Sequence, residues 1–440
     1  MSDSKRPHPY IHIPEVSEKT LHRPEMERDA CGVGVVCHIK GERSHRILRL
    51  GLDSVNNVTH RGALNADMKT GDGAGVSTHL PHKIFLPIAE EMGTKLESNE
   101  QLAIGVFFLA DKDSTDYVKA KVLAEGCLRN RGIGIIGWRE VPTNPKALGD
   151  QAIETMPEIL HLLLKRPEGI DDDQFERELF LARRDIEIKS KKEAIEDFYI
   201  PSLSHRLMVY KGFLVATALE KFYDDLQNPD YETGVCLYHQ RFSTNTFPTW
   251  ALAHPFRMLC HNGEINTVRG NRNWLNSRIG QFESDVWGDD MHLLNEIIDP
   301  DGSDSASLDS ALELLVLSGR SVPHAMAMLV PAAWRIDPFT PQPVADFYKY
   351  HATFCEPWDG PAALAFSDGR TVAASLDRNG LRPARYKITD DGIFSLGSEV
   401  GTCHLDDETV IEKGRLAPSE MLVIEMETGE VFHNTEVKNK

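Results

Sequence analysis

The chain has 440 residues, of which 41% are hydrophobic and 8% aromatic, and this composition predicts a folded protein with a large core. Its net charge of −19, from 48 Lys and Arg against 67 Asp and Glu, opposes contact with a nucleic-acid backbone or an anionic membrane surface. No apolar run reaches the length needed to cross a bilayer. We therefore expect neither nucleic acid nor a membrane among the partners.

The first thirty residues are mostly polar and contain no apolar segment of the kind that a secretion signal requires. The seven cysteines are an odd number, are widely spaced and include no Cys-x-x-Cys pair, which argues against a disulfide framework and against a zinc site. A reducing cytoplasm is therefore the expected location. The cysteines lie at positions 31, 37, 127, 236, 260, 355 and 403.

Apolar runs and helical spacing predict the following elements in chain order. Strands are expected at 33–39, 102–109 and 132–138, and helices are expected around 175–186 and 308–315, where apolar residues recur every three or four positions. Two glycine clusters, at 71–75 and 132–137, lack the strand, helix and Gly-Lys-Ser/Thr context of phosphate loops. We interpret both clusters as turns and sites of close strand packing.

Two hairpins are expected toward the C-terminus. Strand-like residues 363–366 and 371–376 flank Asp368-Gly369, and residues 421–426 and 430–432 flank Thr428-Gly429. Strands that return as hairpins favour an α+β fold with antiparallel sheets over a doubly wound parallel sheet. No internal repeat or low-complexity linker divides residues 31–430 into independent domains.

Cys31 is the first candidate for chemistry, because it follows the polar leader and opens an apolar strand. If residues 1–30 were removed, the thiol nucleophile and an α-amine of pKa near 8 would belong to the same residue. The simpler interpretation is a small buried residue at the start of a strand.

The densest polar region runs from Tyr238 to Asn266 and contains two further candidates. Arg241 could hold a carboxylate with two parallel hydrogen bonds, although a surface ion pair is the more ordinary role. Asn262-Gly263 could offer an amide and an unobstructed backbone N–H to one oxygen, although Asn-Gly is also a common turn. A metal site from His254, Cys260 and His261 is the least favoured option, because adjacent strand residues point to opposite faces.

Asp304, in Gly302-Ser303-Asp304-Ser305, could accept hydrogen bonds from an ammonium group. An Asp among Ser and Gly before a helix is more often a cap or a turn residue. Each of these clues is weak alone, and what joins them is a resemblance that covers nearly the whole chain.

The sequence resembles the glutamine amidotransferase domain of glutamate synthase, a class II amidotransferase of the N-terminal-nucleophile superfamily. The motifs that carry the resemblance occur in the family's order. They are Glu27 to Gly34, His60-Arg61-Gly62-Ala63, Thr70 to Gly75, His239 to Thr246, His261 to Asn266, Gly302 to Ser305 and Asp377 to Pro383. Phe247-Pro248-Thr249-Trp250 and the Gly-Asp-Gly-Ala-Gly stretch point to glutamate synthase in particular.

The resemblance implies a four-layer αββα sandwich with two antiparallel sheets, in which residues 1–30 are a cleaved propeptide, 31–432 the amidotransferase domain and 433–440 a tail. It implies that Cys31 attacks the side-chain amide of glutamine, with its own α-amine relaying the proton. Asn262 and the N–H of Gly263 would stabilise the oxyanion. Arg241 would hold the α-carboxylate of glutamine and Asp304 its α-ammonium.

Family enzymes continue into a synthase portion that carries FMN and an iron–sulfur cluster, and the 440 residues contain neither the flavin barrel nor the terminal β-helix of that portion. We expect no cofactor in this chain and a synthase domain or subunit as the partner that receives ammonia. Two alternatives stay open: a non-catalytic glutamine-sensing module that never exposes Cys31, and an amidotransferase that serves another acceptor.

Overall fold

The computed structural model describes residues 31–440 except 66, 68 and 242–246. The predicted propeptide, residues 1–30, and the end of the motif that begins at His239 lie outside the described residues. Three sheets account for the strands of the described part, and all neighbouring strands within them run antiparallel.

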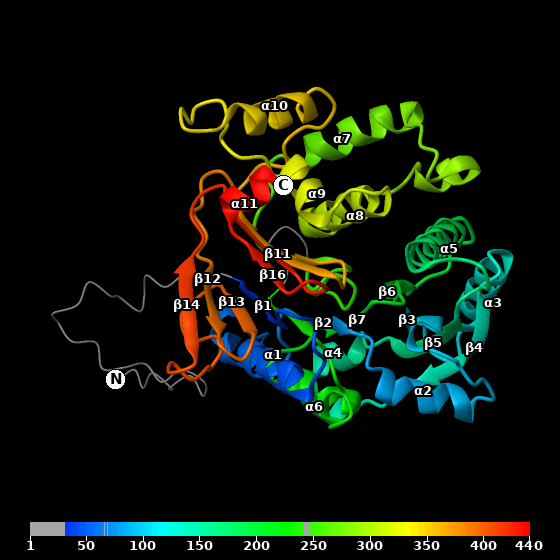
Figure 1. Cartoon of the computed structure of the whole chain (residues 1–440). Helices are drawn as coiled ribbons and strands as arrows, with labels where there is room; N and C mark the ends of the chain where they lie inside the picture. Colours follow the sequence, from blue (N-terminus) through cyan, green and yellow to red (C-terminus); the bar gives the residue numbers. More distant parts are fainter. Residues whose placement is uncertain (1–30, 66, 68, 242–246) are drawn as a thin grey trace, which may run out of the picture.

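The first and second sheets lie face to face at the centre of the molecule (Figure 1). The first has the order β14 (Val410–Arg415), β12 (Arg385–Thr389), β13 (Ile393–Gly397), β1 (Gly32–His38), β8 (Val235–Gln240), β2 (Ala74–His79) and β7 (Leu207–Gly212). The second has the order β16 (Glu430–Phe432), β15 (Met421–Glu425), β11 (Thr371–Leu376), β10 (Ala362–Ser367) and β9 (Leu259–Gly263).

An apolar layer fills the space between these two sheets. It includes alternate residues of β1 (Val33, Val35 and Cys37), together with Leu237 of β8 and Cys260 of β9, all almost fully buried. Because side chains alternate across a strand, the intervening residues of β1 face the other way. One of them, Val36, joins a separate core beneath the first sheet.

Helices cover the outer face of each sheet and complete four layers. The first sheet is covered by α1 (His45–Asn57), α2 (His82–Glu91), α4 (Asp150–Glu154) and α6 (Ala216–Phe222). The second is covered by α7 (Val268–Arg278), α8 (Asp304–Leu317) and α9 (Val322–Leu329), with α10 (Gln342–His351) outside them. Figure 1 shows α1 and α6 on one side of the paired sheets and α8 and α9 on the other.

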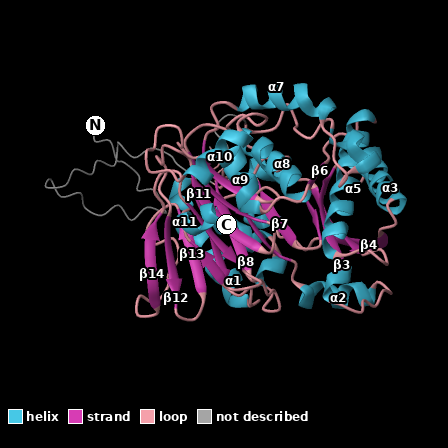
Figure 2. Cartoon of the chain, turned by 45° about the horizontal axis from the view of Figure 1, so that its top comes forward, coloured by secondary structure: helices cyan, strands magenta, loops and turns pink. Residues whose placement is uncertain are grey.

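A third sheet stands beside this sandwich, with the order β4 (Gly134–Glu140), β5 (Glu158–Lys165), β3 (Leu102–Leu109) and β6 (Tyr199–Ser204). Helices α3 (Thr115–Asn130) and α5 (Asp172–Lys192) pack on one of its faces through a separate apolar core. Its other face joins the core that α1 and α2 share. Figure 2 shows this unit at the side of the molecule away from β12 and β14.

The predicted fold class is confirmed: the chain is α+β, with two antiparallel sheets sandwiched between helical layers. Strands β3 and β11 have the predicted bounds, and both expected hairpins are present. The third sheet is the addition that the sequence patterns did not predict. The expected tail contains α11 (Asn434–Asn439), whose Val437 packs against the core of the second sheet.

Buried polar side chains join the helices to the strands that they cover. Ser44 caps α1 by accepting a hydrogen bond from the Ile47 N–H, and Ser303 caps α8 in the same way through Ala306. Asp309 of α8 is fully buried, and its carboxylate accepts hydrogen bonds from the backbone N–H groups of Arg257, Met258 and Leu259 at 3.2, 2.8 and 3.1 Å.

Among the helices of the described part, none is long and apolar enough to cross a bilayer.

Replacing Asp309 with Ala should leave three backbone donors at the start of β9 without an acceptor. We expect the free energy of unfolding to fall by about 3 kcal/mol, because buried unsatisfied donors carry their full desolvation penalty. Thermal melting monitored by circular dichroism measures the loss. Asp309→Asn keeps one carbonyl acceptor and should lose less free energy of unfolding. Equal melting temperatures of the parent and Asp309→Ala would contradict this role for Asp309.

Candidate active site

Cys31 lies directly before β1 and is buried, with 8% of its surface exposed. Val33, Val35 and Cys37 of the same strand point into the layer between the sheets. The two-residue period of a strand therefore directs the Cys31 side chain toward that same space, at one end of it.

Arg241 leaves β8 beside Cys31. Gly32 pairs with Gln240 in the antiparallel register of β1 and β8, so the residues that flank this pair, Cys31 and Arg241, are close in space. The backbone of Arg241 has φ of 88°, which is unusual for a residue with a side chain. Its N–H donates a hydrogen bond of 2.7 Å to the Gly73 carbonyl, and its Nε lies 3.4 Å from Oδ2 of Asp72.

Asn262 and Gly263 end β9, the strand of the second sheet that lies against β1 and β8. Cys260 points into the layer between the sheets, so Asn262, two residues further, points to the same side. Asn262 is 2% exposed, and among the described residues its side-chain amide makes no hydrogen bond. The donor is thus buried, directed toward the space that Cys31 enters, and available there.

Gly263 is required at its position. It has φ of 151°, and a Cβ added to it would lie 1.7 Å from the carbonyl oxygen of Pro361. Any side chain would therefore push β9 away from the neighbouring backbone and displace Asn262. The Asn-Gly pair is not a hairpin turn, because both residues pair with β10.

Asp304 is the first residue of α8, and it contacts the chain that follows Gly263. Its Oδ2 accepts a hydrogen bond of 2.8 Å from the Ile265 N–H, and its Oδ1 accepts one of 2.8 Å from the Ser305 N–H. Ser303, rather than Asp304, is the cap of the helix. The carboxylate is 3% exposed and is held beside the end of β9.

Charges of both signs act on the Cys31 thiol. Burial raises the pKa of Cys31 to about 12, while Arg241 and Arg382 lower it and Asp72 and Asp304 raise it. The register of β1 with β8, the contact of β8 with β9 and the contact of Asp304 with the chain after β9 bring all five predicted site residues to one end of the space between the sheets.

Asp72 and Arg382 are the charged residues that sequence reasoning did not assign to the site. Both lie within motifs that carry the family resemblance, Thr70 to Gly75 and Asp377 to Pro383. Asp72 stands between two glycines in a cluster that was interpreted as a turn. A carboxylate inside such a turn was the available signal, but its partner, Arg241, is distant in sequence and could not be identified from spacing.

Three histidines surround the same end of the sheets. His239 Nε2 lies 2.9 Å from the His261 carbonyl, and the His239 ring stacks on that of His254 with centroids 4.1 Å apart. Burial lowers the pKa of His239 to about 3 and also lowers those of His254 and His261, so these rings are neutral at pH 7. They join β8 to β9 across the layer and add no charge to the site.

The metal site considered for His254, Cys260 and His261 finds no support in the geometry. Cys260 faces the layer between the sheets, whereas His261 turns to the other side, where its Nδ1 lies 2.8 Å from the Ser305 hydroxyl. Within the described ranges no group of three or more His, Cys, Asp or Glu could hold a metal ion.

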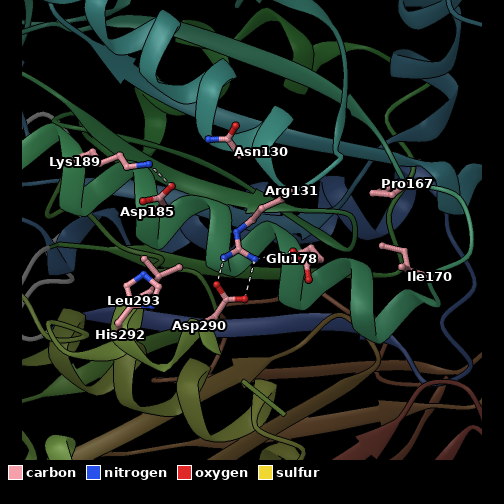
Figure 3. Close-up of a pocket in the computed structure, with 10 residues that line it drawn as sticks. All are labelled: Asn130, Arg131, Pro167, Ile170, Glu178, Asp185, Lys189, Asp290, His292 and Leu293. Carbon is pink, nitrogen blue, oxygen red and sulfur yellow. Dashed lines mark hydrogen bonds and ion pairs between the residues drawn. The ribbon is translucent and has the colours of Figure 1, made fainter. Parts of the chain in front are cut away.

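A cleft of about 640 Å³ lies elsewhere, between α3, α5 and the 3₁₀ helix Gly288–Leu294 (Figure 3). Figure 3 shows Arg131 held between Asp290 and Glu178, with Lys189 paired to Asp185. These charges are satisfied within the protein, and none of the predicted site residues lines the cleft. The ion pairs of Arg131 join the helices of the third sheet to the helical layer of the second sheet.

Comparisons with known proteins show the family of the chain. A family model for class II glutamine amidotransferases matches residues 31–440. The large chain of glutamate synthase [NADPH] from Azospirillum brasilense is 44% identical over 418 residues, which cover 95% of this chain and 28% of that protein. The corresponding large chain from Bacillus subtilis (strain 168) is 40% identical over 421 residues, which cover 96% of this chain and 27% of that protein.

A third relative is the ferredoxin-dependent glutamate synthase, chloroplastic, of Oryza sativa subsp. japonica. It is 44% identical over 417 residues, which cover 94% of this chain and 26% of that protein. The chain therefore spans about a quarter of the length of the curated relatives that it matches.

The raised pKa of Cys31 predicts slow alkylation while residues 1–30 are attached. Because only the thiolate reacts, the rate with iodoacetamide should rise about tenfold for each pH unit between pH 7 and 10, without a plateau. Peptide mass spectrometry separates Cys31 from the other cysteines. The chain unfolded in urea is the control, and its Cys31 should level off near pH 9; a plateau near pH 8 in the folded chain would contradict the assignment.

Proposed function

The chain belongs to the class II glutamine amidotransferase family, and from this membership and the geometry of its site we propose that it is the glutaminase module of a glutamate synthase. The observation that carries the proposal is the convergence of one thiol, one amide donor pair, one guanidinium and one carboxylate at the end of the space between the sheets. These groups are Cys31, Asn262 with Gly263, Arg241 and Asp304.

In the proposed reaction, removal of residues 1–30 converts the backbone nitrogen of Cys31 into a free α-amine. This amine takes the thiol proton, and the sulfur attacks the side-chain amide carbon of glutamine to form a tetrahedral intermediate. The C–N bond then breaks, the amine passes its proton to the leaving nitrogen, and ammonia departs from a γ-glutamyl thioester. Water attacks the thioester, releases glutamate and restores the thiol.

The oxyanion of both tetrahedral intermediates would lie between the Asn262 side-chain amide and the Gly263 N–H. Both donors are fixed by β9 before the reaction begins, so little reorganisation is needed as the charge develops. The close approach of the Pro361 carbonyl keeps this position restricted to glycine and so keeps the donors in place.

Arg241 and Asp304 account for selection of a free amino acid. A guanidinium can hold the α-carboxylate with two parallel hydrogen bonds, and a carboxylate can accept hydrogen bonds from the α-ammonium. A glutamine within a peptide offers neither charge. The site therefore suits L-glutamine as the substrate.

The ammonia would be consumed by a synthase domain or subunit that makes a second glutamate from 2-oxoglutarate by reduction. FMN and an iron–sulfur cluster belong to that synthase portion in this proposal, and the reaction assigned to the present chain uses neither. All seven cysteines are free thiols, which suits a reducing cytoplasm.

The first test is the intact mass of the purified chain together with glutamine-dependent release of ammonia and glutamate. We expect loss of residues 1–30 and equal amounts of the two products. A retained leader with no turnover would instead favour a glutamine-sensing module, and ammonia release that couples to a different acceptor would favour an amidotransferase of another pathway.

Asn262→Ala should lower turnover about 10²–10³-fold while the KM for glutamine stays close to that of the parent, because one oxyanion donor is lost and the substrate contacts remain. Steady-state glutaminase kinetics measure both constants. Asn271→Ala is the matched control, since Asn271 is also buried but donates to the Pro357 carbonyl from the outer helix α7. Unchanged turnover in Asn262→Ala would remove Asn262 from the mechanism.

A further inference from the structure

We propose that Asp72 is a positioning residue that orients the Arg241 guanidinium and thereby sets the preference for substrates with a free α-carboxylate. The inference rests on the proposed function, because it deepens the role that Arg241 has there. It is carried by the contact between the two side chains and by the turn that presents Asp72.

The turn before β2 is constrained to deliver Asp72 to this place. Gly73 has φ of 122°, and a Cβ added to Gly71 would lie 2.6 Å from a methyl carbon of Val215. Asp67 holds the beginning of the turn by accepting a hydrogen bond of 2.7 Å from the Thr70 N–H. The glycines on both sides of Asp72 therefore serve close packing, and the side chain between them is 5% exposed.

A backbone hydrogen bond brings Arg241 to the same turn. Its N–H donates to the Gly73 carbonyl at 2.7 Å, directly after β8 ends its pairing with β2. The positive φ of Arg241 turns its side chain out of the regular path of the strand. Asp72 and Arg241 are thus fixed relative to each other at the level of the backbone.

The side-chain contact between Asp72 and Arg241 is an ion pair at Nε. Oδ2 of Asp72 lies 3.4 Å from Nε of Arg241, which is one of five N–H donors on the planar guanidinium. This ion pair favours side-chain conformations of Arg241 that keep Nε toward Asp72. Arginine otherwise loses much rotamer freedom on binding, so a guanidinium that is already oriented holds a carboxylate more tightly.

Asp72 is not suited to contact substrate or to assist the thiol directly. Its negative charge raises the pKa of Cys31, and it would repel an incoming carboxylate. A carboxylate in this position opposes both ionisation of the thiol and binding of the substrate carboxylate, unless it acts through Arg241. Removal of Asp72 should therefore raise the KM for glutamine if Asp72 positions Arg241. It should lower that KM if Asp72 competes with the substrate for the guanidinium.

The experiment compares hydrolysis of L-glutamine with that of its α-carboxamide, in which the α-carboxylate is replaced by a neutral amide. Products are identified by mass spectrometry so that only cleavage of the side-chain amide is counted. We expect Asp72→Asn to raise the KM for glutamine about tenfold and to change kcat by less than about threefold. The ratio of kcat/KM for glutamine to that for the carboxamide should fall about tenfold, and Arg241→Lys should lower the same ratio.

Asp225→Asn is the matched control, because Asp225 is 4% exposed and pairs with a partly buried arginine, Arg139, at 2.7 Å, away from Cys31. It should lower stability without changing the substrate ratio. The ratio is measured within one preparation and does not depend on the fraction of folded enzyme. If Asp72→Asn is insoluble, Asp72→Ser removes the same charge with a smaller side chain.

Two results would overturn the inference: a substrate ratio equal to that of the parent, or tighter binding of glutamine by the Asp72 variants, which would make Asp72 a competitor. Absence of glutamine hydrolysis by the processed parent would instead overturn the proposed function. The two failures are distinguishable because the parent is measured with both substrates before any variant is compared.

Discussion

The site depends on the packing of two antiparallel sheets whose strand ends coincide. Apolar side chains such as Val35, Leu237 and Cys260 fill the layer between the sheets and fix their separation. The register of β1 with β8 pairs Gly32 with Gln240, and the register of β9 with β10 pairs Asn262 with Ala363. A shift of one residue in either register would turn Cys31 or Asn262 to the opposite face.

This arrangement positions the proposed functional side chains through the backbone. Each is placed by backbone that belongs to the sheets or to their first turns: Cys31 before β1, Arg241 after β8, Asn262 within β9 and Asp304 at the start of α8. Helix α8 is in turn joined to β9 by Asp309. Stability of the sandwich and geometry of the site therefore share the same interactions.

Local patterns predicted the elements whose signals lie within a few residues. The apolar run of β3 and the Asp368-Gly369 hairpin between β10 and β11 are examples, and both have the expected form. The third sheet could not be predicted in this way, because β3 lies between β5 and β6 and pairs with both over long sequence separations. The roles proposed for the five candidate site residues come from the family resemblance, which supplied what spacing could not.

Asp72 shows the same limit at the level of a single side chain. Its glycine neighbours predicted a turn, and the structure contains that turn. The partner of its carboxylate follows only from the three-stranded arrangement in which β8 lies between β1 and β2. Sequence periodicity assigns a residue to a face of its own strand, but contact between side chains of different strands depends on register.

The same geometry makes the backbone nitrogen of Cys31 the point on which activity depends. While residue 30 is attached, this nitrogen is an amide without basicity, and a buried thiol whose pKa is raised to about 12 is protonated at pH 7. Arg241 and Arg382 lower that pKa, but burial, together with Asp72 and Asp304, outweighs them. The charged residues around the thiol are therefore insufficient to activate it. In the proposed enzyme a free α-amine supplies the missing base on the nucleophile's own residue, so removal of residues 1–30 would change the chemistry of the site as well as access to it.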